Sequence, residues 1–167
     1  HKYLEAASLY MTIITQKILD TLATYPTTPD AACRTLPPAA YTDPGLYDLE
    51  IETIFKRKWV LIGRANDIPE PGDWFTFQIL DDPLLIVRGE DGVIRALSNV
   101  CRHRYMPVML EERGNARRFS CSYHRWTYAT DGKFVGAPLM EGSLAFDKAQ
   151  CALPAYPLEI WQGFIFV

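Results

Sequence analysis

The sequence has little of the two residue types that carry much metal and catalytic chemistry: 167 residues contain 4 cysteines and 3 histidines. So few cysteines exclude a disulfide-stapled scaffold, and no secretory signal precedes them. The uninterrupted apolar runs are far shorter than the roughly 18 residues that a membrane-spanning helix needs. No glycine-rich pattern for binding nucleotide phosphates is present. We therefore expect a soluble, cytoplasmic protein with no membrane attachment.

The charge balance also lacks an excess of basic residues. The chain carries 17 lysines and arginines against 20 aspartates and glutamates, which gives a formal net charge of −3. A nucleic-acid-binding domain usually has the opposite balance, so we expect no nucleic acid partner. Hydrophobic residues make up 49% of the chain and charged residues 22%, close to an average globular protein. That composition is enough for a single domain with a sizeable core.

The two ends of the sequence suggest a piece of a longer protein. The first residue is His1 rather than methionine. The last residues, 161–167, predict an apolar β-strand with no turn or polar cap after it. We therefore expect more chain beyond Val167.

The N-terminal part predicts helices. Apolar residues recur at spacings of three and four over 3–25, which is typical of an amphipathic helix that ends at the following proline. Its apolar stripe fits packing within the protein or, alternatively, an oligomer contact. The stretch 26–42 holds four prolines and is predicted to be a linker or extended arm. Asp43 and Pro44 then predict an N-cap and first turn of a short helix that runs to about Lys56.

The rest of the chain predicts strands. Two Asp-Gly pairs, at 91–92 and 131–132, are typical of two-residue hairpin turns. Several short strands with helices only at the N-terminus favour a mainly β fold, either a sandwich or a small barrel. The expected strands are 59–63, 73–80, 84–88, 93–98, 119–121, 126–128, 133–135 and 161–167.

Two short runs combine cysteine with histidine. Cys101 and His103 form C-x-H, and Cys121 and His124 form C-x-x-H. Two cysteines and two histidines could bind Zn²⁺ tetrahedrally, but zinc fingers usually pair cysteine with cysteine and histidine with histidine. A [2Fe–2S] cluster with two thiolates on one iron and two imidazoles on the other suits two loops that each supply one of each. This pattern favours the iron–sulfur interpretation over a zinc-stapled interaction domain.

The same runs resemble a known family. C-R-H-R-Y-M-P-V-M (101–109) and C-S-Y-H-R-W-T-Y-A-T-D-G-K-F-V-G-A-P (121–138) are similar to the N-terminal domain of Rieske-type non-haem iron oxygenases. These are the ring-hydroxylating dioxygenase α subunits with their demethylating and monooxygenase relatives. The lead-in at 50–59, the run at 68–74 and the end at 161–167 also match. The resemblance covers about residues 41–167.

The resemblance implies a fold and a cofactor. The fold is a Rieske iron–sulfur-protein-like antiparallel β-sandwich with a small cluster-binding subdomain, over 43–167, preceded by a helical segment and proline-rich arm over 1–42. The cofactor is a [2Fe–2S] cluster on Cys101, His103, Cys121 and His124. No catalytic residue is expected in this chain, since only His1 remains for general base chemistry or a Ser-His-Asp triad.

The resemblance also implies an electron-transfer role. In the family, a ferredoxin or flavin reductase delivers electrons to the cluster, which passes them to a mononuclear Fe(II) that activates O₂. That iron is held in a catalytic domain expected after residue 167. The intact protein would then be an oxidoreductase and a homotrimer, whereas this chain alone should not oxygenate a substrate. A stand-alone Rieske ferredoxin is the alternative.

Residues around the ligand runs refine this interpretation. Respiratory and photosynthetic Rieske proteins carry two further cysteines that join the loops, and here those positions hold Met106 and Tyr123. We expect no such disulfide, fewer hydrogen bonds to the sulfurs and a reduction potential near the low end of the Rieske range, about −150 mV. Tyr105 stands where the family usually has glycine, so we expect the first loop to depart from the family geometry.

Four more side chains are candidates for an outer role. Arg102, Arg104 and Arg125 flank the ligands and could stabilise a reduced cluster or attract an acidic electron donor; alternatively, they pair with carboxylates of the fold. Trp126 is expected to cover the cluster from solvent, with ordinary core packing as the alternative.

Overall fold

The structure is a computed structural model that describes residues 12–32, 34–138 and 147–167. The chain divides into two compact units, His1–Trp59 and Val60–Val167. The second unit begins later than the domain predicted from residue 43, and that predicted functional boundary stays a prediction. Each unit is described by itself.

The first unit is helical. Helix α2 spans Ile13–Thr24, and the side chain of its N-cap residue Thr12 accepts a hydrogen bond from the backbone N–H of Thr15. The helix predicted over 3–25 is thus confirmed from residue 13, while its first turns lie outside the described residues. A 3₁₀ turn at Tyr25–Thr27 ends it, because Pro26 cannot continue an α-helix. Short 3₁₀ turns at Asp30–Ala32 and Pro38–Tyr41 interrupt the predicted arm.

The second helix of this unit begins as predicted but is capped differently. Helix α3 spans Pro44–Glu50 and continues as a π-helix over Ile51–Phe55, with Asp43 at the N-cap position. The Asp43 side chain makes no cap bond; its two oxygens accept the hydroxyl of buried Thr15 at 3.1 and 2.9 Å. The predicted cap bond is absent because the Asp43 carboxylate instead accepts the Thr15 hydroxyl of α2.

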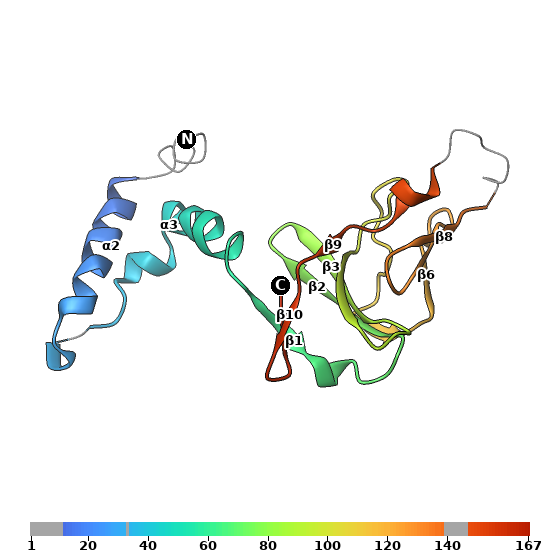
Figure 1. The fold of residues 1–167 in the computed structure, drawn as a ribbon. Coiled ribbons are helices and arrows are strands. Elements are labelled where there is room, and N and C mark those ends of the chain that lie inside the picture. The colour runs from blue at the N-terminus through green and yellow to red at the C-terminus, as the bar shows by residue number, and fades with distance from the viewer. Residues whose placement is uncertain (1–11, 33, 139–146) are drawn as a thin grey trace. The chain divides into compact units, whose positions relative to one another are not determined.

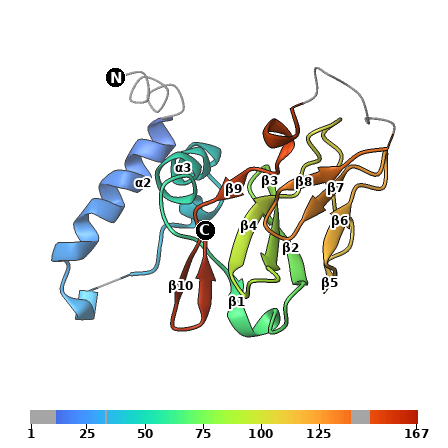
Figure 2. The ribbon, with the colours of Figure 1, turned by 45° about the vertical axis from the view of Figure 1, so that its right-hand side comes forward.

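The described residues of the second unit form three antiparallel sheets (Figures 1 and 2). The strand orders are β5-β2-β3-β4-β9, β6-β7-β8 and β1-β11-β10. The expected mainly β class is confirmed. The strands are β1 Leu61–Arg64, β2 Asp73–Ile79, β3 Asp82–Arg88, β4 Ile94–Ser98, β5 Arg113–Asn115, β6 Arg118–Ser120, β7 Thr127–Ala129, β8 Phe134–Gly136, β9 Ala155–Tyr156, β10 Glu159–Trp161 and β11 Phe164–Phe166.

Strand β3 lies at the centre of this unit and is buried on both faces. Successive side chains of a strand point to opposite faces. Leu85 and Val87 accordingly pack in one core cluster, and Leu84 and Ile86 pack in the other. The first cluster also contains Cys101 and Cys121 together with residues of β6, β7 and β8. The two loops that carry the candidate metal ligands, which begin at Cys101 and Cys121, therefore pack directly against the core.

Both Asp-Gly pairs lie in hairpin loops, but the loops are longer than two residues. In each, a backbone hydrogen bond joins residues four apart, and the glycine, Gly92 or Gly132, has a positive φ. Asp91 and Asp131 each accept the N–H two residues further on, at 3.1 and 3.0 Å. This side-chain bond stabilises the wider loop where a bare two-residue turn was expected.

The single strand predicted over 161–167 is wrong. Residues Glu159–Trp161 and Phe164–Phe166 are two strands of a hairpin. Gln162 and Gly163 between them both have positive φ, 48° and 82°, as the tight primed turn of a two-residue hairpin requires. Gln-Gly carries a weaker turn signal than Asn-Gly or Asp-Gly, so the apolar run around it masked the turn.

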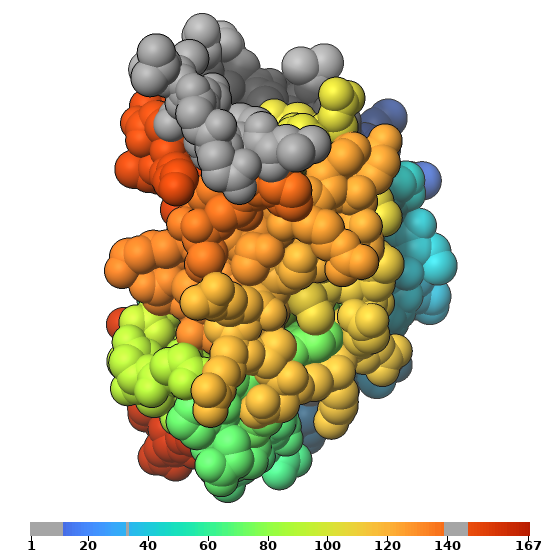
Figure 3. Space-filling model, turned by 90° about the vertical axis from the view of Figure 1, so that its right-hand side faces the viewer, coloured from blue at the N-terminus to red at the C-terminus, as the bar shows by residue number. Residues whose placement is uncertain are grey.

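Figure 3 shows one face of the second unit, where the orange atoms of the β6-β7-β8 region fill the middle.

Within the described residues, no helix is long and apolar enough to cross a membrane.

Candidate metal centre

The two Cys-His runs fold into loops with the same backbone hydrogen bonds. In the first loop, the N–H of Cys101 donates to the carbonyl of Met106 at 2.8 Å. In the second, the N–H of Cys121 donates to the carbonyl of Trp126 at 2.9 Å. Each bond closes the loop five residues after its cysteine. The two loops therefore have the same backbone shape, and each position of the first loop has an equivalent position in the second.

The equivalence extends to a strained residue in each loop. Tyr105 and Arg125 have φ values of 57° and 59°, in the left-handed region, and each N–H donates to the carbonyl of its own loop's cysteine. This conformation costs a non-glycine residue about 1–2 kcal/mol. Tyr105 was expected to change the first loop; instead it adopts the left-handed conformation, with its ring exposed to solvent.

The four predicted ligands are brought together at these loops. Cys101 and Cys121 are 1% and 2% exposed. His103 is partly buried and His124 exposed, with ring centroids 4.6 Å apart and planes at 78°. The thiols therefore form an inner pair on the core and the imidazoles an outer pair.

The pKa shifts of Cys121 and His103 bear on their role as metal ligands. Burial raises the pKa of the Cys121 thiol, and the neighbouring Cys101 thiol raises it further, so a thiolate here needs a compensating cation. Burial, His124 and Arg104 together lower the pKa of His103, which keeps a neutral ring with a free lone pair. With that cation present, both shifts are consistent with a centre that takes thiolates on one side and imidazoles on the other.

A single-ion zinc site and a two-iron centre place different demands on the ligands. Over the described residues, no three or more His, Cys, Asp or Glu side chains gather around a point that could hold a single metal ion. A tetrahedral zinc site needs four ligands around one ion. A [2Fe–2S] centre of the Cys₂His₂ type needs only two pairs, one for each iron.

Tyr128 is a site residue that sequence reasoning missed. Its hydroxyl lies 3.3 Å from the Cys101 sulfur and accepts the backbone N–H of Arg102 at 3.0 Å. Burial, and then the bond to Cys101, raise the pKa of Tyr128, so the hydroxyl keeps its proton. Because the oxygen already accepts from Arg102, that proton is available to the sulfur. The sequence places Tyr128 two residues after Trp126 in a predicted strand, which indicates only that both side chains face the same side; it does not identify Cys101 as the partner.

Trp126 packs against a predicted ligand of the other loop. Its indole is nearly parallel to the His103 ring, with centroids 4.9 Å apart and planes at 8°. It also contacts the ring of Phe134, and it is 8% exposed. Trp126 is thus both a core side chain and a neighbour of the site.

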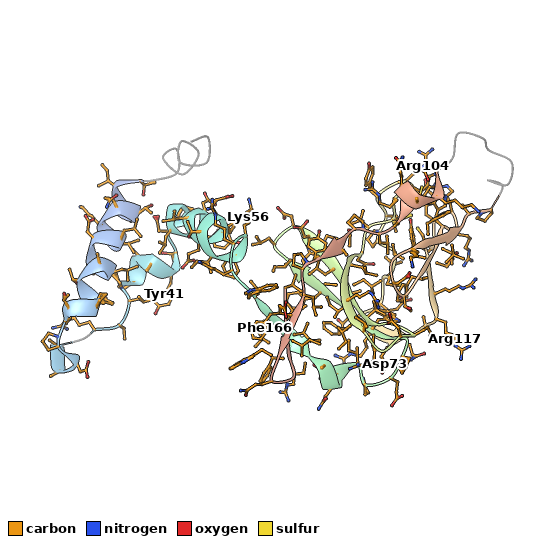
Figure 4. All side chains as sticks on the ribbon, viewed as in Figure 1. Tyr41, Lys56, Asp73, Arg104, Arg117 and Phe166 are labelled. Carbon is orange, nitrogen blue, oxygen red and sulfur yellow. The ribbon has the colours of Figure 1, made fainter. Side chains whose placement is uncertain are left out.

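The three arginines lie on the surface around the loops. Arg102, Arg104 and Arg125 are exposed, and within the described ranges none of them pairs with a carboxylate. Figure 4 shows Arg104 at the end of the second unit opposite Asp73. The loops therefore carry a rim of positive charge.

Comparisons with known proteins match this geometry. A family model described as the Rieske [2Fe-2S] domain matches residues 58–157. The chain is 41% identical over 130 residues to the benzene 1,2-dioxygenase subunit alpha of Pseudomonas putida, covering 77% of this chain and 29% of that protein. It is 37% identical over 134 residues to the glycine betaine monooxygenase oxygenase subunit of Chromohalobacter salexigens, covering 79% and 29%.

A solved structure supports the fold. Naphthalene 1,2-dioxygenase from Rhodococcus sp. bound to indole is similar with a TM-score of 0.80 and 34% identity, over 93% of this chain and 35% of that one. This likeness confirms the predicted sandwich fold. The chain spans about three tenths of the length of the curated relatives.

Proposed function

The chain belongs to the Rieske [2Fe-2S] domain family, and from that premise we propose that Cys101 and Cys121 ligate one iron of the cluster and that His103 and His124 ligate the other. The observation that carries this assignment is the pairing itself: the two loops carry two buried thiols that interact with each other and two imidazoles with ring centroids 4.6 Å apart. When bound, the cluster supplies one-electron transfer.

The thiols, the exposed imidazole and the surrounding arginines would have different roles in such a centre. The buried thiols exclude water from the inner side, while the exposed ring of His124 is accessible to a redox partner. The rim formed by Arg102, Arg104 and Arg125 attracts an acidic electron donor, either a ferredoxin or a flavin reductase.

The whole protein is proposed to be a Rieske non-haem iron oxygenase that hydroxylates aromatic rings or demethylates its substrate. Its relatives include dioxygenase and monooxygenase subunits. Electrons would pass from this domain to a mononuclear Fe(II) that activates O₂ in a catalytic domain of the same polypeptide, in a cytoplasmic homotrimer. Such an iron needs two histidines and a carboxylate. With two of its three histidines assigned here, this chain alone would not oxygenate.

The alternative of a stand-alone Rieske ferredoxin has less support. The relatives described above are oxygenase subunits more than three times as long as the region matched. A separate oxygenase partner able to take electrons from this chain would be needed to favour the alternative.

Electron paramagnetic resonance of the dithionite-reduced chain, with iron, zinc and sulfide analysis, tests the assignment. We expect a Rieske signal with about two irons and two sulfides per chain. Cys121→Ala should abolish the signal and Cys151→Ala should keep it, since Cys151 lies outside both loops. One zinc per chain without labile sulfide would refute the proposal, as would an unaltered signal in the Cys121 variant.

A further inference from the structure

We propose that Trp126 is a positioning residue: carried by the second loop, its indole fixes the ring plane of His103 in the first loop and thereby joins the two loops across the site. This inference rests on the proposed role of His103 as an iron ligand. It concerns the orientation of that ligand and not its identity.

The contact has the geometry of an offset aromatic stack. Planes at 8° with centroids 4.9 Å apart place the indole beside and parallel to the imidazole. Aromatic pairs favour such offset stacking over a direct sandwich. A ring held flat against a second ring can slide but cannot easily turn out of the shared plane.

Trp126 is itself held firmly. Its carbonyl accepts the N–H of Cys121, and its ring contacts Phe134 on β8 at 4.9 Å and 59°. It immediately precedes β7 and is buried in the same core cluster as Cys101. The indole that contacts His103 is therefore part of the core, whereas the His103 side chain is only partly buried.

Among the residues that the structure describes, the ring of His124 has no stacked indole of this kind; its ring neighbours are His103 and Tyr123. Tyr123 is its neighbour in the chain, with a ring tilted by 37° and 61% exposed. Tyr123 belongs to the same loop as His124, so this contact links nothing across the site. Two loops of one backbone shape thus hold their histidines unequally, and Trp126 is the cause of the difference.

The orientation of a ligand ring matters because its lone pair lies in the ring plane. A fixed plane therefore confines the direction from which the His103 nitrogen meets its metal to that plane. The nitrogen couplings measured in the reduced cluster report that direction separately for the two histidines, whereas a contribution to folding alone would not change only one of them.

The test uses the cluster-loaded chain and three variants. Trp126→Leu removes the stacked ring and keeps an apolar side chain, Trp126→Phe keeps a smaller ring, and Trp161→Leu makes the same change on exposed strand β10 as the control. Pulsed paramagnetic resonance measures the hyperfine and quadrupole couplings of the two histidine nitrogens. We expect one pair of couplings to change in Trp126→Leu, a smaller change of the same pair in Trp126→Phe, and none in the control.

Loss of cluster to a chelator provides a second measurement. Because an aromatic pair adds stabilisation beyond its buried area, we expect Trp126→Leu to lose its cluster roughly three- to tenfold faster, with Trp126→Phe between it and the parent. If Trp126→Leu takes up no cluster, the Phe variant decides, since a change confined to one nitrogen is still expected there.

Unchanged couplings in every variant that loads would overturn the inference, and so would an equal change at both nitrogens. Failure of the proposed function would be seen differently: the parent chain itself would lack a Rieske signal with two nitrogen couplings.

Discussion

The hydroxyl of Tyr128 is placed to influence the reduction potential of the proposed cluster through its bond to the buried sulfur of Cys101. The bond to Cys101 is made inside the core, where a hydrogen bond to a charged group is worth about 1.5–3 kcal/mol. An added electron makes a ligating sulfur a better acceptor, so the bond should stabilise the reduced centre more than the oxidised one. It acts against the low potential expected from the loop sequences alone, an expectation that stays a prediction.

Tyr128→Phe removes this hydroxyl and keeps the buried ring. We expect the midpoint potential of the cluster to fall by on the order of 50 mV, since 59 mV corresponds to a tenfold change, or about 1.4 kcal/mol, in a one-electron couple. A redox titration followed by paramagnetic resonance measures the shift. Tyr123→Phe, which removes an exposed hydroxyl from the second loop, is the control and should leave the potential in place. A potential unchanged in Tyr128→Phe would show that the hydroxyl does not bond the ligating sulfur.

The four proposed ligands were predicted from residue type and spacing, which are local features; that the structure brings the two histidine rings together is consistent with them, and the assignment stays a prediction. Tyr128 could not be predicted in this way, because its partner lies 27 residues earlier and the bond exists only when β7 packs beside the first loop. The same holds for Trp126 and His103, which belong to different loops.

At the scale of elements, prediction succeeded where apolar patterns are strong. Strand β3 carries a continuous apolar run, and it was found within two residues of its start. Strand β5 has the exposed sequence Arg-Gly-Asn with no apolar pattern, and it exists because it pairs with β2. Elements that depend on a partner for their conformation leave little local signal.

The bond between Thr15 and Asp43 connects helix α2 to the start of helix α3. Thr15→Val keeps the shape of the side chain but withdraws the hydroxyl from a buried carboxylate, which should lower the free energy of unfolding by about 1–3 kcal/mol. Loss of helical circular dichroism on heating measures the effect. Thr21→Val is the control, because that hydroxyl bonds an exposed carbonyl within α2. Equal stabilities of the two variants would contradict a specific role of the Thr15–Asp43 bond.

The β10–β11 turn allows the cost of backbone strain to be measured separately from the cost of steric overlap. Gly163 has a φ of 82° and Gly136 does not have positive φ, while a Cβ added at either would meet nothing within 4 Å. Gly163→Ala should therefore cost about 1 kcal/mol or more through backbone strain alone, and Gly136→Ala should be neutral or slightly stabilising. Chemical denaturation of both variants measures the difference. If Gly163→Ala is as stable as Gly136→Ala, the turn does not require a left-handed residue.

At the scale of the whole molecule, the four proposed ligands and their described neighbours lie in one unit. Both core clusters, the two ligand loops, Tyr128 and Trp126 belong to Val60–Val167. The family match begins only two residues earlier, at residue 58. The described residues of helices α2 and α3 contribute no predicted ligand and no member of either core cluster.

We therefore expect residues 60–167 alone to fold and to bind the cluster, because a chain of about one hundred residues with a core on both faces of its central sheet can bury enough surface to be stable. The reduced fragment should give the same paramagnetic resonance signal and about the same midpoint potential as the full chain. Residues 1–59, prepared in the same way, should bind neither iron nor sulfide. A fragment that aggregates or takes up no iron while the full chain loads normally would show that the helical unit stabilises the cluster domain, and the functional boundary would then lie nearer to residue 43.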